Sequence, residues 1–271
     1  LPAYAEVAPY NVILVELEDE PSIRFVGNLV ASADGPLNGV DPASIRIGEP
    51  VRVVFTQIED VALPRWFPTT RHLYEGPLYA DVAPGMLEDF EVDEGSEHDR
   101  GDLEMLAAAV EATPFTDAMA AVADLAELTR MWAVERYVGH WDGYTREGGP
   151  NNYYLHSDAT GRFSMLPWGT DQTWSVRLPF EQGPTGRLFT ACLRATDCRA
   201  RFREALIALQ ARVGALDLDA RASSLAAALA PWQQLDPRRE DSLAEITAGV
   251  AAVRAFIAAR PADLASWLAA P

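Results

Sequence analysis

The feature that most constrains the fold is a change of hydrophobic pattern near Pro68. Before it, apolar residues form short Val-, Ile- and Leu-rich runs separated by Gly- and Pro-containing turns, which is typical of β-strands. After Gly186 they recur every three or four residues, which is typical of helices. A chain of 271 residues can hold two modest domains. We therefore expect an α+β protein with one domain over residues 1–69 and a second over residues 70–271.

The first segment is predicted to form a small β-barrel. Its four expected strands are Tyr10–Leu17, Ile23–Val30, Val51–Ile58 and Val61–Pro64. Several short strands within about 70 residues indicate a closed or partly closed barrel.

The second segment is predicted to be mostly helical around one hairpin. Residues 70–100 read as irregular, and the acidic run from Glu88 to Glu104 as a solvated loop, with a cation site as the alternative. A helical pattern over Thr116–Gly139 leads into a loop rich in Gly and Asn that ends at Asn152. A β-hairpin should follow, and then helices with breaks at Pro231, Pro237 and Pro261. The expected strands and helices are Tyr153–His156, Arg162–Leu166, Arg187–Ala195, Cys198–Val213, Leu218–Ala230, Ser242–Ala259 and Ala262–Leu268.

The net charge and the hydropathy of the chain exclude some classes of partner. The net charge of −18 argues against nucleic acid, whose phosphates require basic patches. No apolar run approaches the roughly 20 residues that span a bilayer, and the chain does not open with a signal region. We therefore expect no membrane partner, and a location that is either cytoplasmic or exported after removal of an upstream signal. All 22 basic residues are Arg, so no lysine is available for any task that requires one.

The chain has two cysteines, too few for a structural zinc site. On one continuous helix Cys192 and Cys198 would lie about 9 Å apart along the axis, too far to bond. A helix break at Ala195–Asp197 would let them meet, so the sequence leaves a disulfide open.

Four polar residues that could take part in catalysis or metal binding occur in an informative order. Asp142 follows the predicted helix, Asn151 and Asn152 end the loop, and Asp171 follows the hairpin. Kinases use this order of parts: one Asp orients the attacking hydroxyl, an Asn binds Mg²⁺, and an Asp after a hairpin binds Mg²⁺ across the phosphates. Structural capping of the loop by Asp142 and Asn151 is an equally good interpretation.

Four stretches together carry a resemblance to a known family: Leu73–Gly76, Val134–Tyr144, Asn151–Leu155 and Met165–Trp174. They resemble the CotH kinase family of spore-coat and related proteins, and the resemblance runs from about residue 70 to at least 205. It implies Asp142 as the catalytic Asp, Asn152 or Asn151 as a magnesium ligand and Asp171 as the metal-binding Asp, with ATP and Mg²⁺ as cofactors and a protein as substrate. Many members have Asp at the position of Gly169.

Three stretches of the first segment, Pro9–Leu17, Ser44–Phe55 and Leu63–Phe67, carry a second resemblance. They resemble the OB-fold domain of acyl-CoA-associated proteins that accompany thiolases. This resemblance implies acyl-CoA or a thiolase-like enzyme as a partner of residues 1–69. A cysteine-rich zinc ribbon usually precedes that barrel and is absent here, as is the nucleotide-holding N-terminal lobe expected before Leu73.

Three functional hypotheses follow. The first is an atypical protein kinase, impaired because it lacks lysine, with Arg52 or Arg65 as a substitute although Arg and Lys are not interchangeable at such a site. The second is a non-catalytic binding module, either pseudokinase-like or acting through the OB part. The third is a recombined chain without a selected function. His140 is predicted to be a structural hydrogen-bonding group.

Overall fold

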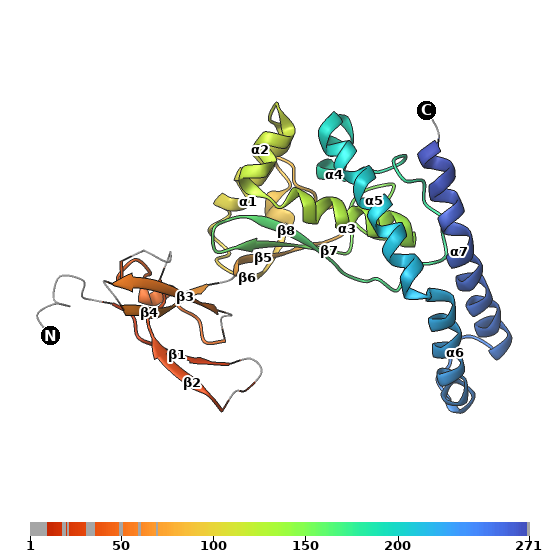
Figure 1. Cartoon of the computed structure of the whole chain (residues 1–271), viewed down its shortest axis with the longest axis horizontal. Coiled ribbons are helices and arrows are strands. Elements are labelled where there is room, and N and C mark those ends of the chain that lie inside the picture. The colour runs from red at the N-terminus through yellow and green to blue at the C-terminus, as the bar shows by residue number, and fades with distance from the viewer. Residues whose placement is uncertain are drawn as a thin grey trace, which may run out of the picture.

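A computed structural model describes residues 10–17, 20, 22–30, 36–48, 51–58, 61–68 and 70–269. Figure 1 shows a smaller N-terminal part built from strands β1 to β4, and a larger lobe in which helices lie against a second sheet. In this view the four N-terminal strands lie apart from the lobe.

The N-terminal part contains two antiparallel strand pairs. Strand β1 (Ile13–Glu16) pairs with β2 (Arg24–Gly27), and β3 (Val51–Ile58) pairs with β4 (Val61–Pro68). A parallel bridge between Leu29 and Trp66 connects the two pairs, and both side chains are buried together with Val15. The Asn11 side chain reinforces the bridge, because it accepts from Leu29 N–H at 2.7 Å and donates to its carbonyl at 2.9 Å.

The predicted strands are therefore confirmed in place, with β1 and β2 shorter and β4 longer than expected, but the described residues do not show the predicted OB-type barrel. A closed barrel would bury alternate side chains of every strand. Here Leu14, Phe25 and Val26 on β1 and β2 are exposed, as is the neighbouring Val12.

The sheet of the larger lobe has the order β6-β5-β7-β8 and is antiparallel throughout. Its strands are β6 (Glu91–Glu94), β5 (Thr70–Gly76), β7 (Tyr153–Asp158) and β8 (Phe163–Pro167). The predicted hairpin is confirmed as β7 and β8. The irregular structure predicted for residues 70–100 is wrong, because β5 lies at the centre of this sheet. The residues that β5 buries are His72, Tyr74 and Gly76, so the strand lacks the apolar alternation by which strands are identified.

The described residues contain seven α-helices. They are α1 (Gly101–Glu111), α2 (Phe115–Val122), α3 (Leu125–Val138), α4 (Arg187–Arg194), α5 (Thr196–Leu216), α6 (Leu218–Leu235) and α7 (Leu243–Ala269). Helix α3 packs between α5 and the sheet, and the main core surrounds it. The largest fully buried apolar side chains of this core include Trp132, Tyr137, Tyr144, Tyr153, Phe163, Phe189 and Phe202.

Two predicted helix breaks are wrong, because Pro231 lies inside α6 and Pro261 inside α7. An internal proline costs about 3 kcal/mol through its missing N–H and its clash with the preceding turn. In α7 the residues on both sides of Pro261, Phe256 and Leu264, are buried. Burial of side chains of this size contributes about 1.5–3 kcal/mol each, which offsets the cost.

One acidic residue of the run predicted to be a solvated loop is buried. Asp102 in α1 is fully buried and accepts from the Tyr74 hydroxyl at 2.7 Å, with His72 Nδ1 2.8 Å from its other carboxylate oxygen. Burial by itself raises the pKa of Asp102, but the hydrogen bonds from His72 and Tyr74 outweigh it and lower the pKa to about 2. This network joins α1 to the centre of the sheet.

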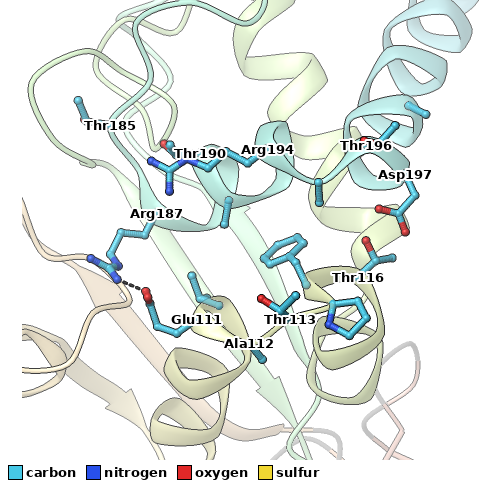
Figure 2. A pocket seen from close by; sticks show the side chains of 16 residues that line it. Glu111, Ala112, Thr113, Thr116, Thr185, Arg187, Thr190, Arg194, Thr196 and Asp197 are labelled. Carbon is cyan, nitrogen blue, oxygen red and sulfur yellow. Dashed lines mark hydrogen bonds and ion pairs between the residues drawn. The ribbon is translucent and has the colours of Figure 1, made fainter.

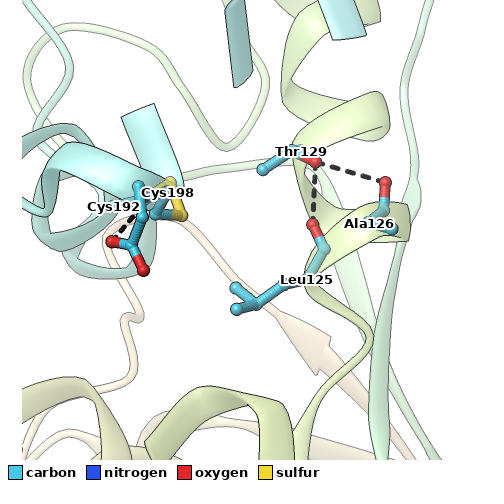
Figure 3. The surroundings of a disulfide bond; sticks show 6 residues. Leu125, Ala126, Thr129, Cys192 and Cys198 are labelled. Atoms are coloured by element: carbon cyan, nitrogen blue, oxygen red, sulfur yellow. Dashed lines mark hydrogen bonds between the residues drawn. A yellow bond between two sulfur atoms is a disulfide. The ribbon is translucent and has the colours of Figure 1, made fainter. Parts of the chain in front are cut away.

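The open question of the cysteines is resolved by a helix break. Helix α4 ends at Arg194 and α5 begins at Thr196, and a disulfide joins Cys192 to Cys198 with their Cα atoms 5.1 Å apart. Figure 3 shows the bond beside Leu125 and Thr129 of α3. Across the described part of the chain, none of the helices combines the length and the apolar character needed to cross a membrane.

Candidate functional site

The loop that carries Asp142 begins at the C-terminus of α3. Asp124 caps the first turn of this helix by accepting from the N–H groups of Ala126 and Glu127, both at 3.0 Å. Gly139 ends the helix in the left-handed conformation, with φ of 67°. A β-carbon there would collide with the Val176 carbonyl, so the chain turns sharply at a residue that must be glycine.

Glu135 holds the beginning of the loop in place. Its buried carboxylate accepts from the N–H groups of Tyr144 at 3.0 Å and Thr145 at 2.9 Å. His140 lies beside it, with Nδ1 3.6 Å from a Glu135 oxygen. Gly143 allows this close approach, because a β-carbon at that position would collide with both Glu135 and His140. Glu135 of α3 therefore fixes the backbone around Asp142.

Asp142 and Asn152 lie side by side in this loop. The Asn152 amide donates to the Asp142 carboxylate at 3.0 Å, and Arg146 Nη1 lies 3.2 Å from the other carboxylate oxygen. The side chains of Asp142 and Arg146 keep 23% and 19% of their surface exposed, so the pair borders solvent. Asn151, the alternative ligand, is half-buried, and it is Asn152 that contacts Asp142.

The segment after the hairpin returns to the same place. Trp168 N–H donates to the Asn152 carbonyl at 3.0 Å, and His140 Nε2 lies 3.2 Å from the Gly169 carbonyl. A β-carbon on Gly169 would lie 2.8 Å from the Asn152 side chain. Asp171 follows two residues later, exposed, and accepts from Gln172 at 2.9 Å. His140 thus connects the two segments of the site, in agreement with its predicted structural role.

Two buried arginines that the sequence analysis did not single out brace the site. Arg260 of α7 donates to the Tyr137 carbonyl at 2.9 Å and the Leu178 carbonyl at 2.6 Å, and also to the Arg136 carbonyl. Arg136 itself donates to the carbonyls of Pro179, Gln182 and Thr145. Burial lowers the pKa of Arg136 to about 10, which leaves it charged at neutral pH. These bonds join α3, its loop and residues 178–182.

A third buried network connects the loop to α4. The Tyr144 hydroxyl donates to Asp81 at 3.2 Å and accepts from Leu188 N–H at 2.9 Å, while Asp81 also accepts from Arg187 N–H at 2.9 Å. Burial raises the pKa of Asp81, against the effect of these hydrogen bonds. The network fixes the start of α4 relative to the loop.

The arginines predicted to replace a nucleotide-binding lysine lie in the N-terminal part. Arg65 of β4 donates to Asn28 at 3.0 Å, and Arg52 lies on β3. Both strands are separated from the loop between α3 and β7 in Figure 1. The arginine that contacts Asp142 is instead Arg146, which the sequence analysis did not single out.

The three residues predicted to carry the chemistry all have hard oxygen atoms, and of these the structure brings Asn152 into contact with Asp142. Asp142 presents a carboxylate, Asn152 an amide oxygen and Asp171 an exposed carboxylate. In the described residues no group of three or more His, Cys, Asp or Glu side chains is placed to hold a metal ion. Carboxylate and amide oxygens like those of Asp142, Asn152 and Asp171 are ligands that suit Mg²⁺, because this ion takes one or two carboxylates and keeps several waters.

Comparison with known protein families identifies the larger lobe. The family model described as CotH kinase protein matches residues 81–264, from the loop after β5 into α7. The match leaves out residues 1–69, and their resemblance to an OB-fold acyl-CoA-associated domain has no support from the comparisons. A search of curated proteins found no match to the chain.

Proposed function

Because the chain belongs to the CotH kinase protein family, we propose that its larger lobe transfers the γ-phosphoryl group of Mg-ATP to a hydroxyl group of a protein. The observation that carries the proposal is the contact of Asp142 with Asn152, next to the segment that leads to Asp171. Phosphoryl transfer depends mainly on positioning and electrostatics. The loop of this site is held by Glu135 of α3, and the C-terminus of α3 is held in turn by Arg260 of α7.

In this proposal Asp142 orients the acceptor hydroxyl and takes its proton. The role requires a carboxylate at the edge of solvent that is held in one orientation. The bonds from Asn152 and Arg146 hold Asp142 in this way, and the Glu135 contacts fix the backbone on which it lies.

Asn152 and Asp171 are the proposed magnesium ligands, with Asn151 as the alternative to Asn152. The amide of Asn152 uses its nitrogen on Asp142, which leaves its oxygen for a cation. When bound, Mg²⁺ would neutralise part of the phosphate charge.

Arg146 is proposed to supply the positive charge that other kinases take from lysine. It is half-buried next to Asp142 and belongs to the same loop. A guanidinium can bind phosphate oxygens through two parallel N–H groups. This assignment removes the need for Arg52 or Arg65.

The test combines binding and transfer on the intact chain. Calorimetry should detect Mg-ATP binding by the wild type and its loss in Asp171→Asn, while Asp142→Asn should bind Mg-ATP but transfer at least about 100-fold less phosphate to casein. Arg146→Gln should also reduce transfer, with partial recovery in Arg146→Lys. Asp117→Asn, an exposed change on α2, is the control that should match the wild type.

A non-catalytic binding module is the second candidate, favoured by the absence of lysine from the whole chain. It predicts no transfer by the wild type and partner binding that survives Asp142→Asn and Asp171→Asn. Wild-type transfer that both variants retain would contradict the proposed roles of these two residues.

A further inference from the structure

A pocket of about 940 Å³ lies between α1 and α2 on one side and α4 and α5 on the other (Figure 2). Its volume is within the range of pockets that bind ligands. The side chains that line it are unusually rich in hydroxyl groups. They include Thr113, Thr116, Thr185, Thr190 and Thr196. None of these residues belongs to the proposed phosphoryl-transfer site.

One cation of this pocket has no carboxylate partner among the described residues. Arg187 forms an ion pair with Glu111 across the pocket wall (Figure 2). The Asp197 carboxylate accepts from Cys198 N–H at 3.0 Å. Arg194 is exposed, and no described carboxylate forms an ion pair with it. The pocket therefore offers one free guanidinium for an anion.

The geometry of α4 and α5 favours the same kind of ligand. Arg187, Thr190 and Arg194 lie three and four residues apart, so they share the face of α4 that lines the pocket. The disulfide encloses Arg194 and Thr196 in a short loop, which fixes the backbone that carries the free charge and reduces the entropy lost on binding.

The pocket is in contact with the loop of the proposed active site. The Thr185 hydroxyl accepts from Gly149 N–H at 2.6 Å and donates to the Arg146 carbonyl at 3.2 Å. Arg146 in turn contacts Asp142. Thr185 is thus connected through Arg146 to Asp142, the carboxylate that is proposed to take the proton of the acceptor hydroxyl. A ligand bound at Thr185 therefore lies next to the loop that carries Asp142.

We propose that this pocket docks the acceptor protein through an acidic side chain that binds Arg194. The word acceptor rests on the proposed kinase function, whereas the preference for an acidic segment rests on the pocket alone. A single unpartnered guanidinium selects a carboxylate over a neutral or basic side chain.

Fluorescence anisotropy with the full chain tests this proposal. Three matched fluorescein-labelled peptides of Ser and Gly, with interspersed Glu, Gln or phosphoserine, serve as probes. The wild type should bind the Glu peptide about tenfold more tightly than the Gln peptide, as expected for a charge-assisted hydrogen bond. Arg194→Gln should abolish this preference and Arg194→Lys should keep part of it. Arg212→Gln, which removes the same charge from an exposed position of α5 outside the pocket, should keep all of it.

Equal binding of the Glu and Gln peptides by the wild type, or a preference unchanged in Arg194→Gln, would overturn the proposal. Tight binding of the phosphoserine peptide without preference for Glu would also overturn it, since the ligand would then be a phosphate. Calorimetry of Mg-ATP binding separates the two proposals, because Arg194→Gln should bind Mg-ATP as the wild type does. A wild type that prefers Glu but neither binds nor uses Mg-ATP would leave an acidic-peptide site on a non-catalytic module.

Discussion

The buried carboxylate of Asp102 gives a prediction whose size follows from the structure. The pKa of Asp102 is about 2 in the folded lobe, against its ordinary value of 3.8. A tenfold difference in proton affinity corresponds to about 1.4 kcal/mol, so ionisation of Asp102 contributes about 2 kcal/mol to the free energy of unfolding. Because the folded pKa is the lower one, this stability is fully present above about pH 4 and is lost as the pH falls toward about 2.

Asp102→Asn keeps the size of the side chain and removes its charge. We expect the variant to be about 2 kcal/mol less stable than the wild type near pH 7, and the difference to shrink below about pH 4. Urea denaturation, followed by the fluorescence of the buried Trp132, measures the difference at each pH. Asp117→Asn, on the exposed side of α2, should differ from the wild type by less than about 0.5 kcal/mol at every pH.

Two results would refute this reasoning. A negligible loss in Asp102→Asn at neutral pH would mean that the bonds from His72 and Tyr74 do not favour the ionised form. A loss that stayed constant down to about pH 2 would mean that it comes from packing and not from charge.

Three further changes have defined outcomes. Arg260→Met removes buried hydrogen bonds to three carbonyl groups and should lower the free energy of unfolding, measured by urea denaturation, by about 3–5 kcal/mol. The control Arg254→Met breaks an exposed ion pair of the same helix and should lower it by less than about 1 kcal/mol. Equal losses in the two variants would contradict the role of Arg260. Joint replacement of Cys192 and Cys198 by Ala should lower stability by about 2 kcal/mol, as expected for a short loop, and a thermal shift unchanged by the replacement would show that the bond adds nothing. Gly143→Ala should destabilise the lobe by about 1–3 kcal/mol and weaken Mg-ATP binding in calorimetry, because the added methyl group displaces Glu135 and His140; unaltered binding would show that the loop adapts.

The parts of the site that lie near each other in the sequence were the predictable ones. Asp142, Asn152 and the hairpin that leads to Asp171 follow one another within 30 residues, and the hairpin has both β-rich runs and a Gly-containing turn. Order and spacing therefore predicted the elements, and the structure then brought Asn152 to Asp142. The roles of these residues stay predictions.

The parts of the fold and of the site that depend on tertiary contacts could not be predicted from the sequence. Strand β5 buries His72 and Tyr74, whose polar groups are tolerated only because Asp102 lies opposite them, and no local pattern reveals such a partner. Arg146 resembles any exposed loop arginine until its ion pair with Asp142 is seen. Local propensity predicts a break at Pro261, because it gives no weight to the burial of the helix on either side of this residue.

The dependence of the α3 C-terminus on Arg260 also bears on how the protein is made. Arg260 follows the Tyr137 carbonyl that it binds by 123 residues, which a ribosome adding about 5–20 residues per second needs about 6 to 25 s to synthesise. Once residue 171 has been added, the nascent chain contains Asp142, Asn152 and Asp171, but the carbonyl groups at the C-terminus of α3 still have no donor from α7. The support of the loop is therefore completed only when α7 has left the ribosome, and a chain that stalls before residue 260 lacks the Arg260 bonds that hold the end of α3.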